Sequence, residues 1–232
     1  MVRQEKRCRQ RGCPAPAADE YVRSWRLPVG SLHAGQNTPA RRRRAARDRT
    51  TLVAQIGGSV VMRVLVTGAG GFVGRALVAR LIASGKRVTA LSRRPEALRA
   101  LIPDASAVRA WQPLEGPPPG EAFEGVDAVV HLAGEKVAGV WTSAKRRAIE
   151  DSRVVGTRHL VEGIRAAGGT GMLVSASAIG YYGERGETVL GEQDGPSGDF
   201  LSRVCQRWER EARGAEAAGW TVTCLRIGIV LE

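Results

Sequence analysis

VLVTGAGGFVGRALVARL, residues 64–81, is the stretch that decides the fold. It opens with an apolar run typical of a buried strand and closes with apolar side chains at the spacing of an amphipathic helix. Between these parts, four glycines fall within seven positions: Gly68, Gly70, Gly71 and Gly74. Glycine has no Cβ and adopts conformations that other residues avoid. The stretch therefore predicts a strand, a tight turn and a helix that begins at the turn.

The spacing of Gly68, Gly71 and Gly74 favours a dinucleotide at this turn. The first glycine permits the turn, the second lets backbone approach a diphosphate, and the third lets the helix pack against the strand. Free N–H groups and the helix dipole attract the phosphates. The alternative is a flexible loop without a ligand, and the strand, helix and second strand around the glycines argue against it.

Strand-like and helix-like segments alternate from Met62 onward. Strands are expected at 62–67, 87–92, 107–111, 127–134, 172–177 and 220–230, and helices at 72–85, 95–102, 143–167 and 199–218. This alternation predicts an α/β fold with a doubly wound parallel sheet of the Rossmann type, covered by helices on both faces. Ligands of such sheets bind beyond the carboxyl ends of the strands, so we expect the site there.

The end of the second strand indicates which dinucleotide binds. An acid about 20 residues after the glycines would bind a ribose 2′-hydroxyl, but the strand ends in Ser92, Arg93 and Arg94. Arginine suits planar recognition of a 2′-phosphate. The alternative is a solvated corner of two exposed arginines. The sequence predicts that NADP(H) is preferred and that NAD(H) is possible.

The formal net charge of +12 is concentrated in the first quarter of the 232-residue chain. Residues 1–61 hold thirteen Lys and Arg against four acids, whereas residues 62–232 hold twenty-two against nineteen. Residues 1–61 show no helical or strand period and are expected to be disordered. They could be a basic arm for nucleic acid or a membrane surface, a transit peptide, or an extension outside the working protein. We favour the last reading, in which translation starts at Met62.

The remaining composition excludes several classes of protein. The four cysteines, Cys8, Cys13, Cys205 and Cys224, show no metal-ligand spacing and no disulfide framework. No apolar run approaches the length of a membrane span. We therefore expect no metal, no membrane and a cytoplasmic location, while the sequence leaves the oligomeric state open.

Five motifs together resemble the extended short-chain dehydrogenase/reductases, and more narrowly the atypical epimerase family proteins with a GYYG signature. They are TGAGGFVG (67–74), DAVVHLAGE (127–135), SRVVGT (152–157), SASAIGYYG (175–183) and FLSRVCQRWE (200–209). The resemblance covers residues 62–232 and implies an NAD(P)-binding Rossmann domain followed by a smaller substrate domain. It also implies that the last strand and most of the substrate domain are missing from this chain.

The expected cofactor contacts come from the glycine turn, the end of the second strand, the HLAG segment and the long helix. They are Gly68, Gly70, Gly71, Phe72, Val73, Gly74, Ser92, Arg93, Arg94, Leu132, Ala133, Gly134 and Arg153. Arg153 could hold a phosphate or an acidic substrate, or it could form a surface ion pair with Glu150. His131 is expected to pack and hydrogen-bond rather than to titrate.

The resemblance implies catalysis by a Tyr, a Lys four residues later and a Ser, but no lysine follows Lys145. Ser177 matches the position of the family's Ser, and Tyr181 and Tyr182 follow it. These three are the candidate catalytic residues. A backbone-capping serine and an aromatic wall are the alternatives, and Cys205 could be a thiol acid or a buried, inert cysteine.

One further feature of the tyrosine loop bears on function. Tyr181 and Arg185 have the spacing of a substitute pair, although they lie in a loop. We expect an NADP(H)-binding oxidoreductase or epimerase-like protein that moves a hydride on an unknown carbonyl or sugar-nucleotide-like small molecule. A non-catalytic NADP(H)-sensing protein is the alternative. Nucleic-acid binding would be a property of residues 1–61 and is not expected for the rest.

Overall fold

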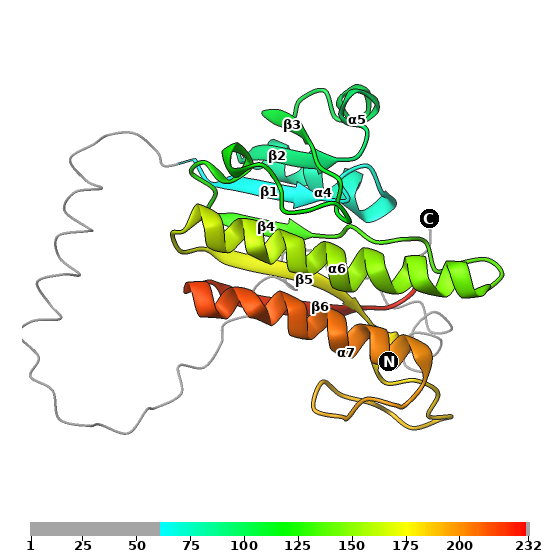
Figure 1. Cartoon of the computed structure of the whole chain (residues 1–232). Coiled ribbons are helices and arrows are strands. Elements are labelled where there is room, and N and C mark those ends of the chain that lie inside the picture. The colour runs from blue at the N-terminus through cyan, green and yellow to red at the C-terminus, as the bar shows by residue number, and fades with distance from the viewer. Residues whose placement is uncertain (1–60, 231–232) are drawn as a thin grey trace, which may run out of the picture. The chain divides into compact units, whose positions relative to one another are not determined.

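A computed structural model describes residues 61–230, and the predictions made for residues 1–60 lie outside them. The elements are β1 (Arg63–Thr67), α4 (Phe72–Ala83), β2 (Arg87–Ser92), α5 (Pro95–Leu101), β3 (Ala107–Ala110), η1 (Gly120–Phe123), β4 (Ala128–His131), α6 (Ser143–Ala167), β5 (Met172–Ala178), η2 (Ile179–Tyr181), α7 (Phe200–Arg213), η3 (Gly214–Ala218) and β6 (Thr221–Ile227). The strands form one parallel sheet in the order β3-β2-β1-β4-β5-β6, which confirms the predicted fold (Figure 1).

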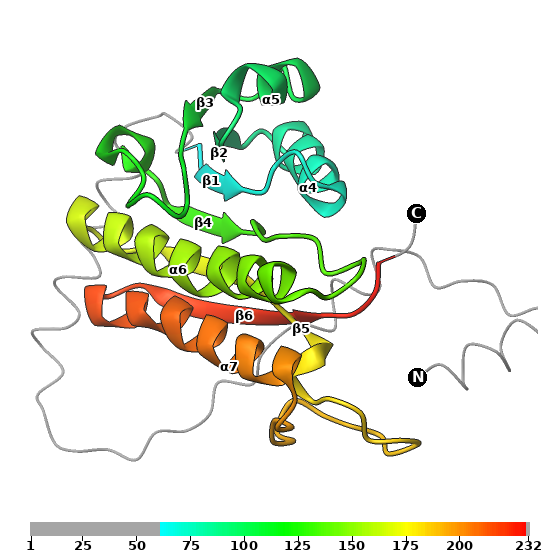
Figure 2. The ribbon, with the colours of Figure 1, turned by 45° about the vertical axis from the view of Figure 1, so that its right-hand side comes forward.

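Helices cover both faces of the sheet. Along β1, Leu65 points into a cluster with α6 and α7, whereas Val64 and Val66 point into a second cluster with α4 and α5. Figure 2 shows α6 and α7 side by side on one face, and Val78 of α4 and Leu98 of α5 belong to the second cluster on the opposite face. Because neighbouring residues of a strand point to opposite faces, an unbroken apolar strand requires this double cover.

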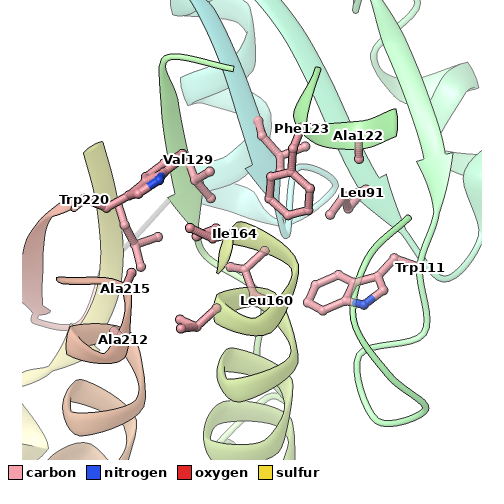
Figure 3. Close-up of a cluster of buried hydrophobic side chains, with 13 residues drawn as sticks. Leu91, Trp111, Ala122, Phe123, Val129, Leu160, Ile164, Ala212, Ala215 and Trp220 are labelled. Atoms are coloured by element: carbon pink, nitrogen blue, oxygen red, sulfur yellow. The ribbon is translucent and has the colours of Figure 1, made fainter. Parts of the chain in front are cut away.

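The larger cluster joins the middle of the sheet to α6 and the end of α7. Figure 3 shows Leu160 and Ile164 of α6 among Val129 of β4, Phe123 of η1 and Trp111. Leu160 and Ile164 are fully buried, four residues apart on one helix face. This packing fixes α6 against the sheet, so the residues of α6 near the carboxyl ends of the strands have defined positions.

Element ends differ from the predictions where local backbone chemistry decides them. The predicted helix 72–85 ends at Ala83, because Ser84 caps it and Gly85 takes a φ of +73°. The predicted helix 199–218 is α-helical only to Arg213 and continues as η3. Between β3 and β4, the structure has the short η1 after the proline-rich segment 117–119, since proline lacks the N–H that a helix interior needs.

Candidate functional site

The glycine turn between β1 and α4 packs directly on the end of β4. Gly68 has a φ of +69°, and a Cβ there would lie 2.7 Å from the carbonyl carbon of Leu132. The N–H of Gly71 donates to the carbonyl oxygen of Gly68 at 3.0 Å and closes the turn. Glycine is required at position 68 both by its φ and by the approach of the β4 backbone.

The N-terminus of α4 is left open to a ligand. Its N-cap residue is Gly71, which has no side chain to accept from the first amides, and no acid lies in the first turn. By contrast, the Thr142 hydroxyl caps α6 and the Asp199 carboxylate caps α7. The first amides of α4 therefore keep their hydrogen-bonding capacity and partial positive charge for an anion.

A cavity of about 570 Å³ begins at this turn and crosses the carboxyl edge of the sheet. Of the predicted cofactor contacts, it is lined by Gly68, Gly70, Gly71, Ser92, Arg93, Arg94, Leu132, Ala133 and Gly134. Phe72, Val73, Gly74 and Arg153 do not line it, and neither do the candidate catalytic residues Ser177, Tyr181 and Tyr182. The structure thus brings the β1, β2 and β4 ends together in one cavity.

Sequence reasoning missed a second wall of this cavity. It consists of the segment 111–115 after β3, two leucines of α5, Ala148 and Ser152 of α6, and Glu135. The Nδ1 atom of His159 hydrogen-bonds the carbonyl oxygen of Pro113 at 2.7 Å and holds the segment against α6. No local signal marks such residues, because the wall forms only when α6 packs beside the β3–β4 connection.

The β2 corner presents cations at the cavity rim. The backbone N–H of Arg94 donates to the Ser92 hydroxyl oxygen at 3.0 Å, which shapes the turn. The side chains of Arg93 and Arg94 are exposed and line the cavity. Two guanidinium groups without an acid in the same turn suit a phosphate rather than a ribose diol.

A buried polar network lies beneath the cavity floor. The Nδ1 atom of His131 hydrogen-bonds the Thr67 hydroxyl at 2.6 Å, and its Nε2 atom hydrogen-bonds the Thr157 hydroxyl at 2.8 Å. The backbone N–H of Ala133 donates to the Thr67 hydroxyl oxygen at 3.2 Å. Burial, aided by the charge of Arg153, lowers the pKa of His131 to about 4. His131 therefore packs as a neutral ring near neutral pH.

We expect the free energy of unfolding to decrease as the pH is lowered, because of His131. Its pKa is about 4 in the folded chain and 6.5 as an ordinary histidine, so the unfolded chain binds the extra proton between these values. The stabilisation is complete above pH 6.5, and about 3 kcal/mol is lost by pH 4. Urea unfolding of wild type and His131→Asn at pH 4 to 7 measures this effect. The difference in unfolding free energy between the two proteins should shrink by this amount from pH 7 to pH 4. His159→Asn is the control, and a constant difference would contradict the assignment.

Arg153 holds the segment after β4 instead of forming a surface ion pair. Its Nη1 atom donates to the carbonyl oxygens of Glu135 at 3.0 Å and Ile149 at 3.2 Å. Glu150, the alternative partner, pairs with Arg207. The alternative, a surface Arg153–Glu150 pair, is therefore wrong, because Arg153 turns inward and its guanidinium carbon lies 5.1 Å from the centre of the Trp208 ring.

The Ser177 hydroxyl points into a buried charge cluster. It donates to Oε1 of Glu209 at 2.6 Å, and both side chains are buried. Arg226 donates from Nε and Nη2 to the two Glu209 oxygens at 2.9 and 3.0 Å. Ser177 and Arg226 are register partners on β5 and β6, so their side chains share the face that α7 covers. Burial alone would raise the pKa of Glu209, but these hydrogen bonds lower it overall.

Arg226 also organises the two candidate tyrosines. Its Nη1 atom donates to the Tyr182 hydroxyl oxygen at 2.8 Å, and its guanidinium carbon lies 3.5 Å from the centre of the Tyr181 ring. Arg185, the partner suggested by spacing, instead donates to carbonyl oxygens of its own loop. The substitute pair suggested by sequence therefore does not form, because Arg226 of β6 occupies the position facing the tyrosines.

Cys205 is a buried thiol that donates weakly to the carbonyl oxygen of Ala178, with a distance of 3.8 Å between Sγ and oxygen. Burial raises the pKa of this thiol, so it stays protonated near neutral pH. These surroundings favour the inert cysteine over the thiol acid.

The strand order, the open glycine turn and the cavity across the strand ends define a Rossmann protein of the dinucleotide-binding class. Residues 64–230 match the NAD dependent epimerase/dehydratase family, and the chain belongs to this family. An epimerase family protein of Mycobacterium bovis is 35% identical over 170 residues, which are 73% of this chain and 54% of that protein.

Two solved structures resemble the chain in fold and sequence. The nucleoside-diphosphate sugar epimerase of Corynebacterium glutamicum has a TM-score of 0.62 and 33% identity, over 83% of this chain and 40% of that one. The human epimerase family protein SDR39U1, solved with NADPH, has a TM-score of 0.60 and 29% identity, over 73% of this chain and 55% of that one. The chain spans about half the length of the curated relatives that it matches.

Proposed function

We propose that the chain binds NADP(H) in the cavity at the carboxyl edge of the sheet. The observation that carries the proposal is the continuous cavity from the open α4 N-terminus to the Arg93–Arg94 corner. The diphosphate of the cofactor would lie at the N-terminus of α4, and the adenosine 2′-phosphate would lie at the Arg93–Arg94 corner. The structure of the human relative with NADPH supports this choice of dinucleotide.

The turn fits a diphosphate because side chains are absent where its oxygens would approach. Gly70 and Gly71 line the cavity without a Cβ, so their backbone is open to the ligand. Gly68 brings the floor formed by Leu132 and Ala133 within van der Waals contact. A diphosphate in this position would accept hydrogen bonds from backbone amides, and its negative charge would lie at the positive end of the α4 dipole.

For catalysis, we propose Tyr181 and Tyr182 as the acid–base candidates and a carbonyl or sugar-nucleotide-like small molecule as substrate. The nicotinamide, when bound, would supply hydride chemistry at C4. A guanidinium has no acceptor, so Arg226 can only donate to the Tyr182 oxygen. The Tyr182 hydroxyl hydrogen then stays available to donate to a substrate oxygen. Ser177 would act from behind, by orienting Glu209 and through it Arg226.

A non-catalytic NADP(H)-sensing protein is the second candidate. Two observations favour it: the Ser177 hydroxyl is committed to Glu209, and no lysine follows Lys145 in the sequence. NADPH oxidation against a panel of aldehydes, ketones and sugar nucleotides separates the two. The sensor is identified if NADPH binds but is not oxidised with any of these substrates. The same result is required of a longer chain that spans the full length of the family's proteins.

The proposed partner is therefore a small molecule rather than nucleic acid, and the proposed compartment is the cytoplasm. Within residues 61–230, no helix combines the length and apolar character that crossing a bilayer requires.

We expect Arg93→Ala to weaken NADPH binding about 10- to 100-fold, which corresponds to the loss of a charge-assisted hydrogen bond to the 2′-phosphate. NADH has no 2′-phosphate, so its affinity should stay within about twofold. Fluorescence titration of both nucleotides measures the change. Arg80→Ala, an exposed arginine at the far end of α4, is the control. Tighter binding of NADH than NADPH by wild type would overturn NADP(H) selectivity, and an unchanged preference in Arg93→Ala would overturn the assignment of the 2′-phosphate to Arg93.

A further inference from the structure

Arg153 is a partly buried cation without an ion-pair partner in the described part of the chain. Its guanidinium donates to two backbone carbonyls and lies against the Trp208 ring. The two nearby acids are engaged elsewhere, since Glu135 accepts from Lys145 at 2.7 Å and Glu150 pairs with Arg207. A charge withdrawn from water without a counter-ion is costly, so its retention requires a reason.

The guanidinium lies directly under the cavity floor. A Cβ at Gly134 would be 3.2 Å from the guanidinium carbon of Arg153, so glycine is the residue that lets the two approach. Gly134 itself lines the cavity. The charge therefore acts on a ligand through a single layer of backbone, in a region where water screens it little.

The position of Arg153 along the cavity indicates which part of a dinucleotide it faces. The Arg93 corner lies at the end of β2 and the open helix terminus follows β1, whereas Arg153 lies between the end of β4 and α7. Since the strand order is β2-β1-β4-β5, Arg153 is on the far side of the diphosphate site from the adenosine corner. The remaining half of the dinucleotide is the nicotinamide riboside.

We infer that Arg153 is a positioning and specificity-determining residue that makes the site distinguish reduced from oxidised NADP(H). The inference rests on the proposed NADP(H) site. The oxidised nicotinamide ring carries a positive charge and the reduced ring is neutral, while their phosphates are the same. A fixed cation below the ring therefore disfavours NADP⁺ relative to NADPH. The chain would hold the reduced cofactor until a hydride acceptor is present.

The test is the ratio of the dissociation constants of NADP⁺ and NADPH, measured by titration calorimetry with the full chain. We expect wild type to bind NADPH more tightly, and Arg153→Met and Arg153→Gln to lower the ratio about tenfold. Arg153→Lys keeps the charge and should keep the ratio. Arg158→Met is the matched control, because Arg158 lies on the same helix and pairs with Glu211 at the surface.

The outcomes separate this inference from the proposed function. If the neutral variants weaken both nucleotides equally, Arg153 acts on the diphosphate and the inference is wrong, while NADP(H) binding stands. An unchanged ratio in folded variants also overturns it. If wild type binds neither nucleotide, the proposed function fails, and the inference fails with it. Circular dichroism of each variant establishes folding, and Arg153→Gln provides the ratio if Arg153→Met is unfolded.

Discussion

Gly74→Ala will destabilise the protein by at least about 3 kcal/mol, although alanine is the better helix former. Gly74 lies in the first turn of α4, where propensity alone favours alanine by about 1 kcal/mol. An added Cβ would lie 2.2 Å from the carbonyl oxygen of Gly68 and 2.9 Å from the Cα of Ala69. Both atoms belong to the backbone of the glycine turn, so the contact is relieved only if α4 moves away from β1.

Urea unfolding measures this effect, and NADPH titration of any folded Gly74→Ala protein should show lost binding, because the displaced turn no longer aims its amides. Gly120→Ala is the control, since an added Cβ there has no neighbour within 4 Å. Equal stability of Gly74→Ala and wild type would mean that the close packing of α4 on the turn is wrong.

Arg226→Met will cost about 3–5 kcal/mol of stability, because it leaves the Glu209 carboxylate buried without its cation. The side chains of Glu209 and Arg226 are 8% and 20% exposed, and Arg226 binds both carboxylate oxygens. Arg158 and Glu211 provide a matched pair with the same two-point geometry at the surface, where they are 47% and 24% exposed. Arg158→Met should cost no more than about 1 kcal/mol.

A double-mutant cycle separates the pair from packing. Arg226→Met together with Glu209→Gln removes both charges, so its cost should be clearly smaller than the sum of the single changes. Chemical unfolding of the four proteins gives the coupling energy. If the losses of stability in the two single variants simply add in the double variant, Glu209 and Arg226 do not form a buried ion pair. Equal losses of stability in Arg226→Met and Arg158→Met would lead to the same conclusion.

The elements of the fold could be predicted because their signals are local. The apolar runs of β1 and β4, the glycines at 68–74 and the period of α6 are each contained in one stretch of sequence. The predicted cofactor contacts that line the cavity lie at the end of a strand or shortly after it, and parallel strands bring such residues to one edge.

The partners of the candidate catalytic residues could not be predicted in this way. Ser177 meets Glu209, and Tyr182 meets Arg226 across 44 positions of the chain. These contacts depend on the register of β6 against β5 and on the rotation of α7, which the apolar pattern does not specify. The inward orientation of Arg153 could not be predicted either. Glu150 and Arg153 are three residues apart on a helix, and this spacing is compatible both with a surface ion pair and with burial of one of the two side chains.

By itself, the sequence determined the parallel sheet, the glycine turn and the arginine corner, since backbone freedom, strand ends and charge are properties of neighbouring residues. Only the tertiary structure decided the second wall of the cavity, the Glu209–Arg226 pair and the place of Arg153 beneath Gly134. Each of these joins residues from separate elements, and their distances exist only once the sheet register and helix packing are fixed.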